Sequence, residues 1–189
     1  MTIQKFVIKR FGAQKGKVIN DRQKALYERM AAAMKGKSPN QIRTLQKTIL
    51  PRVALYKALT ALQYPEEEAF SSIKEYLFDF VGKELNRTLR RMELLPGFFW
   101  LFRTEMYKQI SANDNWDTEV MENGKDVISY NIKKCLWYDA CREHDCPELC
   151  QIFCDVDYVL YGNMKKVGFK RQGTIGTGAA VCDFTYRRK

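Results

Sequence analysis

The sequence lacks the short motifs of several large enzyme and metal-binding classes. It contains no G-x-S-x-G, no P-loop, no G-x-G-x-x-G and no H-E-x-x-H. These absences remove the usual signatures of α/β-hydrolases, P-loop nucleotide binding, dinucleotide binding and zinc peptidases. No C-x2-C pair occurs either, so the common zinc-finger and zinc-ribbon spacing is missing.

Histidine is almost absent, since His144 is the only one in the chain. A Cys–His nucleophilic pair would therefore have to use this residue. His144 lies between Glu143 and Asp145 at the end of a predicted helix. That setting is typical of a surface residue.

Long apolar runs are also missing. No stretch approaches the roughly 18 apolar residues that a membrane-spanning helix needs. The first residues, Met-Thr-Ile-Gln-Lys-Phe, carry charge and lack the apolar segment and cleavage site of a signal peptide. The six cysteines then indicate a reducing, cytoplasmic location, where thiols serve as core residues, metal ligands or nucleophiles.

Positive charge is concentrated at one end of the chain. The net charge is +10; residues 1–60 hold 14 Lys and Arg against two acidic residues, which gives +12, and residues 61–189 hold 18 against 20, which gives −2. A helical layer covered by long basic side chains explains this asymmetry. The alternative is a polyanion-binding protein, but no recognised nucleic-acid motif occurs. We expect at most weak, salt-sensitive and non-specific binding of nucleic acid through residues 1–60.

The first 110 residues have mainly helical patterns. Helices are predicted over 20–35, 40–62 and 66–91, and Pro51 should kink or divide the second. Pro96-Gly97 ends the third helix. The aromatic run 98–102 that follows is typical of buried core, with a pocket wall as the alternative.

The second half has strand patterns on either side of two helices. Strands are predicted over 116–122 and 126–134, joined by a hairpin at Asn123-Gly124, and over 167–175 and 181–188. The sequence therefore predicts a single α+β domain over 1–189. In this fold an N-terminal helical layer packs on a C-terminal antiparallel sheet that has an inserted helix pair.

The second inserted helix, 145–163, carries a row of thiols. Pro147 suits its first turn and Gly162-Asn163 its end. At about 100° per residue, one arc of roughly 80° collects the following side chains: Cys146, Cys150, Cys154, Asp157 and Tyr161. Buried cysteines often act as small core hydrophobes, and this explanation stays open for Cys146 and Cys150. Asp157 differs, because a half-buried carboxylate needs partners that also set its pKa.

Two segments carry a family resemblance. Cys-Pro-Glu-Leu-Cys-x-x-Phe-Cys-x-x-Asp (146–157) and Arg-x-Gly-Thr-Ile-x-x-Gly-x3-Cys-Asp-Phe (171–184) resemble the L-2-amino-thiazoline-4-carboxylic acid hydrolase family. The segment 130–143, with a cysteine before its short helix, fits as well. The resemblance implies hydrolytic opening of a cyclic isothiourea that carries a carboxylate, giving a carbamoyl-cysteine. It also carries over these positions: Cys135, Cys154, Asp157, Thr174, Gly178, Cys182 and Asp183.

The chemistry of that reaction suggests roles for these residues. Water must reach a carbon between nitrogen and sulfur, and the leaving ring atom needs a proton; alternatively, a thiolate attacks first. We therefore predict Cys154 as nucleophile or metal ligand, Asp157 as base and Cys182 as second thiol. Substrate binding is predicted for Arg171, which would hold the substrate carboxylate, together with Thr174 and Asp183.

Two other classes of function remain open from the sequence: a non-catalytic small-ligand or metal-binding module, and the polyanion-binding protein described above. The thiols could hold a divalent metal ion in a non-catalytic ligand-binding module, with Cys135, Cys150, Cys154 and Cys182 as candidate ligands. The glycine-bearing segment 173–178 could hold an anion, although a hairpin loop explains it better.

Overall fold

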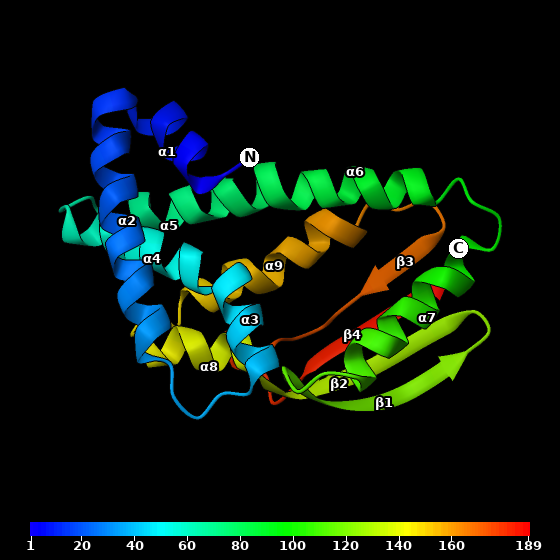
Figure 1. Cartoon of the computed structure of the whole chain (residues 1–189). Helices are drawn as coiled ribbons and strands as arrows, with labels where there is room; N and C mark the ends of the chain where they lie inside the picture. Colours follow the sequence, from blue (N-terminus) through cyan, green and yellow to red (C-terminus); the bar gives the residue numbers. More distant parts are fainter.

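The computed structural model describes residues 1–189 and divides them into a helical half and a sheet half (Figure 1). The strands form one antiparallel sheet in the order β1-β2-β4-β3. This arrangement confirms the predicted α+β class, with helices before the sheet. The strands are β1 (Trp116–Gly124), β2 (Val127–Cys135), β3 (Val167–Lys170) and β4 (Cys182–Arg188).

The chain begins with two helices, of which the first was not predicted. They are α1 (Ile3–Phe11) and α2 (Ala13–Ala33), so the predicted helix over 20–35 begins earlier than expected. Gly12 adopts φ 82° between them and turns the chain sharply. The turn brings α1 so close that a Cβ at Gly16 would lie 2.6 Å from the Ile8 Cα.

The next helix divides as predicted, and each part has a visible start. Ser38 and Gln41 form a capping box at the beginning of α3 (Pro39–Lys47). Pro51 stands in the first turn of α4 (Leu50–Ala61), where its missing N–H costs nothing. Helix α4 is buried along most of its length and lies at the centre of the larger core.

A long rod follows, which contains an irregular middle. It consists of α5 (Glu66–Glu75), a π-helical segment η1 (Tyr76–Gly82) and α6 (Lys83–Met92) (Figure 1). The predicted helix over 66–91 is confirmed in extent, although nothing in the sequence indicated the π-helix. At Gly82 the rod approaches helix α9 (Leu149–Tyr161), where a Cβ would lie 3.0 Å from side-chain atoms of Val156 and Val159.

Helix α7 (Phe98–Ser111) runs along the sheet (Figure 1). Its first turns bury Phe98, Phe99 and Phe102 in a second, smaller core between α7 and the strands. The aromatic run is therefore mainly core, as predicted, but Trp100 remains 59% exposed. None of the helices is long and apolar enough to cross a membrane.

The inserted helix pair lies between β2 and β3. Helix α8 (Leu136–Glu143) follows β2 directly, and α9 begins at Leu149, two residues after Pro147. The third strand is shorter than the predicted 167–175, because the chain leaves the sheet after Lys170. A 3-10 turn, η2 (Ile175–Thr177), then leads to β4.

Candidate active site

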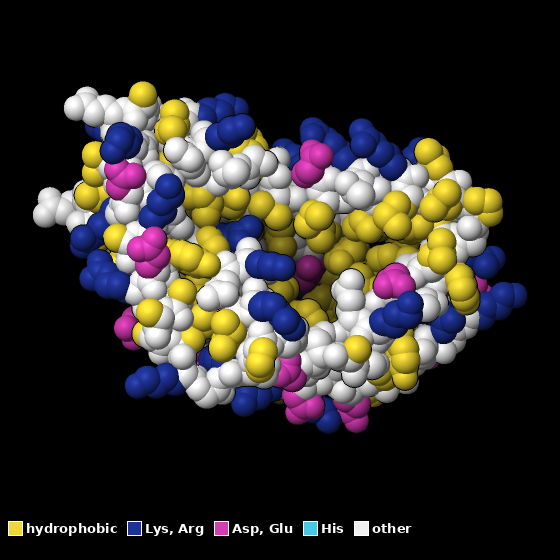
Figure 2. All heavy atoms as spheres, in the orientation of Figure 1, with side chains coloured by type: hydrophobic (Ala, Val, Ile, Leu, Met, Phe, Trp, Pro, Cys, Tyr) yellow, Lys and Arg dark blue, Asp and Glu magenta, His cyan; other side chains and the backbone are white.

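A cavity of about 260 Å³ lies where α9, the π-helical rod, α7 and the sheet meet. Figure 2 shows this hollow at the middle of the molecule, with an acidic side chain in its depth. Of its 19 lining residues, 15 are hydrophobic, so its few polar groups determine what it can bind. The polar and charged lining residues are Thr48, Arg52, Gln109 and Asp157.

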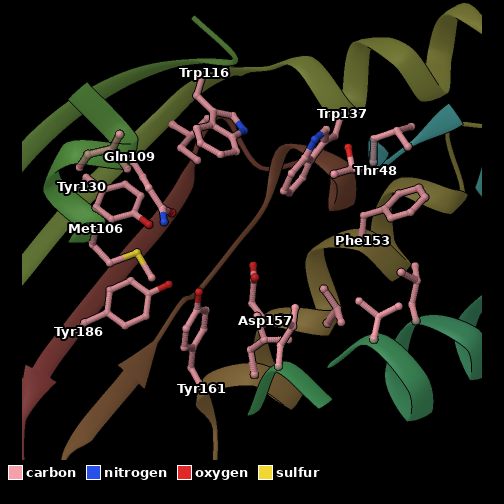
Figure 3. A pocket seen from close by; sticks show the side chains of 18 of the residues that line it. Thr48, Met106, Gln109, Trp116, Tyr130, Trp137, Phe153, Asp157, Tyr161 and Tyr186 are labelled. Atoms are coloured by element: carbon pink, nitrogen blue, oxygen red, sulfur yellow. The ribbon is translucent and has the colours of Figure 1, made fainter. Parts of the chain in front are cut away.

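Asp157 projects from α9 into this cavity (Figure 3). Its side chain is 20% exposed. Burial among aromatic and aliphatic neighbours raises the pKa of the Asp157 carboxyl to about 7, because the charged form loses hydration; Arg171 opposes this rise and Asp155 adds to it. A carboxyl with this pKa exchanges its proton near neutral pH, as a general acid–base group must.

Arg171 lies behind Asp157 and fixes its position. Arg171 Nη1 donates to Asp157 Oδ2 at 2.7 Å, and Nη2 donates to the carbonyl oxygen of Cys154 at 2.9 Å. The guanidinium also stacks on three rings, with its Cζ 4.9 Å from the ring centre of Tyr158 and 5.3 Å from that of Phe184. Only 2% of the Arg171 side chain is exposed. It therefore contacts α9 and the aromatic rings, and it does not line the cavity.

Three tyrosines complete the wall near Asp157. Tyr130 comes from β2, Tyr161 from α9 and Tyr186 from β4. Figure 3 shows their hydroxyl groups turned toward the same space as the Asp157 carboxyl. Burial raises the pKa of all three phenols, so they remain neutral O–H donors at physiological pH. None of the three was predicted as a site residue, although Tyr161 lies on the predicted helix arc that also carries Asp157.

Two further side chains on the cavity wall, Arg52 and Trp137, each have a buried N–H group without a hydrogen-bond acceptor. Arg52 Nη1 donates to the carbonyls of Lys47 (2.7 Å) and Thr48 (2.5 Å), but its buried Nε has no hydrogen-bond partner, and no carboxylate pairs with it. The buried Nε1 of Trp137 is also without a partner. Burial lowers the pKa of Arg52 below its usual value, because the charged form loses hydration. A buried cation without an anion is costly, which makes this position suited to an anionic ligand.

The predicted thiols lie outside the lining of this cavity. Cys154 and Cys150 pack against Gly176, where a Cβ would lie 3.3 Å and 2.9 Å from their respective Sγ atoms. Cys182 Sγ accepts from the backbone N–H of Ile175 at 3.2 Å. The pKa of the Cys154 thiol is raised chiefly by its hydrogen bond with Cys150 and then by burial, and burial raises the pKa of Cys182. Both groups are therefore thiols, and not thiolates, at neutral pH.

The predicted substrate-binding loop residues hold the backbone together. The Asp183 carboxylate accepts from the N–H groups of Gln172 (3.0 Å) and Gly173 (2.7 Å). Thr174 caps the 3-10 turn η2 through a capping box with Thr177. Gly178 ends that turn at φ 90°, a conformation that favours glycine. These contacts fix the shape of the segment between β3 and β4 and fasten it to Asp183 on β4.

The candidate metal ligands do not form a group whose geometry could bind a metal ion. Cys135 is buried at the end of β2, with a pKa that burial raises to about 12. All six cysteines are free thiols. Nowhere do three or more His, Cys, Asp or Glu side chains form a group that could hold a metal ion.

The comparison with known proteins gives a family. The sequence profile described as L-2-amino-thiazoline-4-carboxylic acid hydrolase matches residues 23–186, most of the chain. The protein belongs to this family. No curated protein matches it. A solved structure of the Fe(II) unliganded H-NOX protein from K. algicida aligns over 99% of this chain and 92% of that one, at 9% identity and a TM-score of 0.30.

The match to the L-2-amino-thiazoline-4-carboxylic acid hydrolase family includes the segments that carried the resemblance, and it also includes Arg52 and the three tyrosines. Sequence reasoning missed Arg52 although a signal was present. It is the only charged residue in the apolar segment 49–56, at the beginning of the largely buried helix α4. A lone charge in such a segment needs a partner or a ligand.

Proposed function

We propose that the protein hydrolyses a small cyclic substrate at a C–N/C–S centre, with Asp157 as the general base. One observation carries this proposal. A single carboxyl whose pKa is raised to about 7 stands on the wall of an otherwise apolar cavity. The family's printed name supports hydrolysis as the reaction type.

The proposed reaction opens a thiazoline-type ring by adding one water molecule. Deprotonated Asp157 takes a proton from water as the water oxygen bonds to the carbon between nitrogen and sulfur. The carbon–sulfur bond then breaks, the proton that Asp157 took from water passes to the leaving sulfur, and the second water proton ends on the ring nitrogen. The product is a carbamoyl-cysteine with a free thiol. The neutral hydroxyl groups of Tyr130, Tyr161 and Tyr186 supply O–H donors beside the reacting atoms.

We assign the substrate carboxylate to Arg52 in place of Arg171. Arg171 is engaged by Asp157 and by the Cys154 carbonyl, and it is almost completely buried. Arg52 lines the cavity and has an unpaired Nε donor. A guanidinium suits a carboxylate because it offers parallel N–H donors. The substrate would then span the cavity between its anion site and the base.

The roles of the thiols stay predictions. Attack by Cys154 or Cys182 would first require a proton to leave a thiol whose pKa is raised, which makes the water route easier at neutral pH. If a thiol is the nucleophile, Cys154→Ser or Cys182→Ser abolishes turnover. If water attacks directly, both variants retain most activity.

The test uses 2-amino-thiazoline-4-carboxylic acid and measures the thiol that ring opening releases. Asp157→Asn should lower kcat by about 10²- to 10⁴-fold, the usual contribution of a general base. Asp155→Asn is the matched control, because it removes a carboxylate of the same helix that lies 4.0 Å from the same guanidinium and is 37% exposed. A fully active Asp157→Asn enzyme contradicts the assignment.

The Arg52 assignment has its own test. Arg52→Gln should weaken binding of the carboxylate substrate by roughly tenfold to a hundredfold, since hydrogen bonds to charged groups contribute about 1.5–3 kcal/mol. The carboxamide analogue should bind wild type and variant about equally. A purely structural role of Arg52 would weaken both ligands alike.

A further inference from the structure

One end of the molecule presents exposed apolar side chains from the turn between α6 and α7. Every residue of Met92–Gly97 is exposed except Glu93, and Leu94 is 83% exposed. The next helix adds Trp100 to the same end, where Figure 1 places the end of α6, the beginning of α7 and the C-terminus. Clusters of large exposed apolar side chains mark interaction sites, because exposure to water has no benefit for folding.

This turn is held in place, so its exposure is a fixed feature. The Glu93 carboxylate is buried and accepts from the backbone N–H groups of Lys166 (2.6 Å) and Lys165 (3.2 Å). Gly97 adopts φ 65° immediately before α7. The leucines therefore project from a turn that is fastened to the chain before β3, and they do not fold back onto the core.

Positive charge surrounds Trp100. A surface depression next to it is lined by five basic residues and by no acidic one: Arg103, Lys125, Lys166, Arg188 and Lys189. Arg90 and Arg91 add two more cations in the last turn of α6. Asp126 pairs with Arg188 and Glu93 binds backbone N–H groups. The other four basic residues of the depression form no salt bridge with a carboxylate side chain.

We propose that this end, defined by Leu94, Leu95, Trp100 and the five basic residues above, docks onto an anionic lipid surface. Leucine and tryptophan side chains insert at the boundary between headgroups and acyl chains, where the amphipathic indole is favoured. Lys and Arg beside them attract anionic headgroups, each strengthening binding about fivefold. The combination of apolar tip and cationic surround matches a bilayer surface and requires no membrane-spanning helix.

The test measures binding of the purified protein to vesicles by flotation. Vesicles of phosphatidylcholine with 30% phosphatidylserine, roughly the anionic range of a cytoplasmic leaflet, should bind the protein at low salt, and pure phosphatidylcholine vesicles should not. The Lys125→Gln/Lys166→Gln variant should bind about 25-fold more weakly. Arg22→Gln/Lys24→Gln on α2 removes the same charge from the other end of the chain, and it should keep wild-type binding.

The contribution of the apolar side chains to vesicle binding is tested by a variant and a matched control. Leu94→Ser/Trp100→Ser should lose most vesicle binding with an unchanged thermal unfolding midpoint, because both side chains are exposed. Ile8→Ser/Val18→Ser changes exposed apolar side chains of α1 and α2, far along the chain from this end, and should bind normally. Equal binding to neutral vesicles, or equal loss in the α2 control, overturns the proposal. So does a protein that self-associates through Leu94 and Trp100 without binding vesicles, as sedimentation would show.

Discussion

The raised pKa of Asp157 should be measurable as a dependence of stability on pH. Between the usual carboxyl pKa of 3.8 and the value of about 7 in the folded protein, the unfolded chain has lost this proton while the folded protein still holds it. The free energy of unfolding therefore falls as pH rises through this window, by about 1.36 kcal/mol per pH unit. The sum is roughly 4 kcal/mol, present in full below pH 4 and lost above pH 7.

Asp157→Asn isolates this contribution, since the amide has nearly the same shape and can still accept from Arg171. Urea unfolding at half-unit steps from pH 4 to 8 gives the stability of both proteins. The free energy of unfolding of wild type minus that of the variant should fall steadily by a few kcal/mol between pH 4 and pH 7. Above pH 7 this difference should stay constant. A difference that stays constant with pH would show that Asp157 ionises like an ordinary aspartate. Asp157 could not then be a base tuned to neutral pH, and the proposed mechanism would lose its central residue.

Three shorter predictions concern the surroundings of this residue. Arg171→Met should destabilise the fold by about 3–5 kcal/mol in urea unfolding at pH 8, because it removes one partner of a buried pair; a loss below 1 kcal/mol would contradict the proposed support of Asp157. Gly176→Ala should cost about 1–3 kcal/mol, since its Cβ would lie 2.9 Å from the Cys150 Sγ; Gly168→Ala is the matched control, because it also lacks a positive φ and its Cβ would meet no atom closer than 3.5 Å. Dialysis against a chelator should leave hydrolysis unchanged, and activity restored only by added metal would favour the metal-site alternative.

The sequence led to Asp157 because a carboxylate among thiols and apolar residues breaks the pattern of a buried helix face. It also led to the antiparallel sheet, since Asn123-Gly124 and the alternation in β2 are strong local signals. The depth of Asp157 and its pairing with Arg171 depend on how the segment after β3 returns across α9. Such contacts between distant segments have no local signature.

The other cavity residues show the same limit. The alternation of residues along the strands predicts on which face of the sheet Tyr130 and Tyr186 lie. It does not indicate which helix packs on that face. Arg52 was not predicted as a site residue, because the strongest local signal in its segment is Pro51, which marks a helix boundary. Asp183 was predicted to bind substrate from the family resemblance, and the structure shows its carboxylate holding two backbone N–H groups. Residue type alone does not distinguish a carboxylate that binds the substrate from one that binds backbone N–H groups of its own chain.

The π-helical segment Tyr76–Gly82 has a consequence for how this protein tolerates changes in length. A π-helix closes i→i+5 hydrogen bonds, so it accommodates one more residue than an α-helical turn between the same two ends. Removing one residue there could restore α-helical bonding while α5 and α6 keep their faces, whereas the same deletion within α4 would turn everything after it by about 100°. Leu77 and Val81, which line the cavity, lie inside the segment. A one-residue deletion there would thus change the shape of the cavity while the helices on either side keep their packing, so insertions and deletions, and not only substitutions, can reshape what the cavity accommodates.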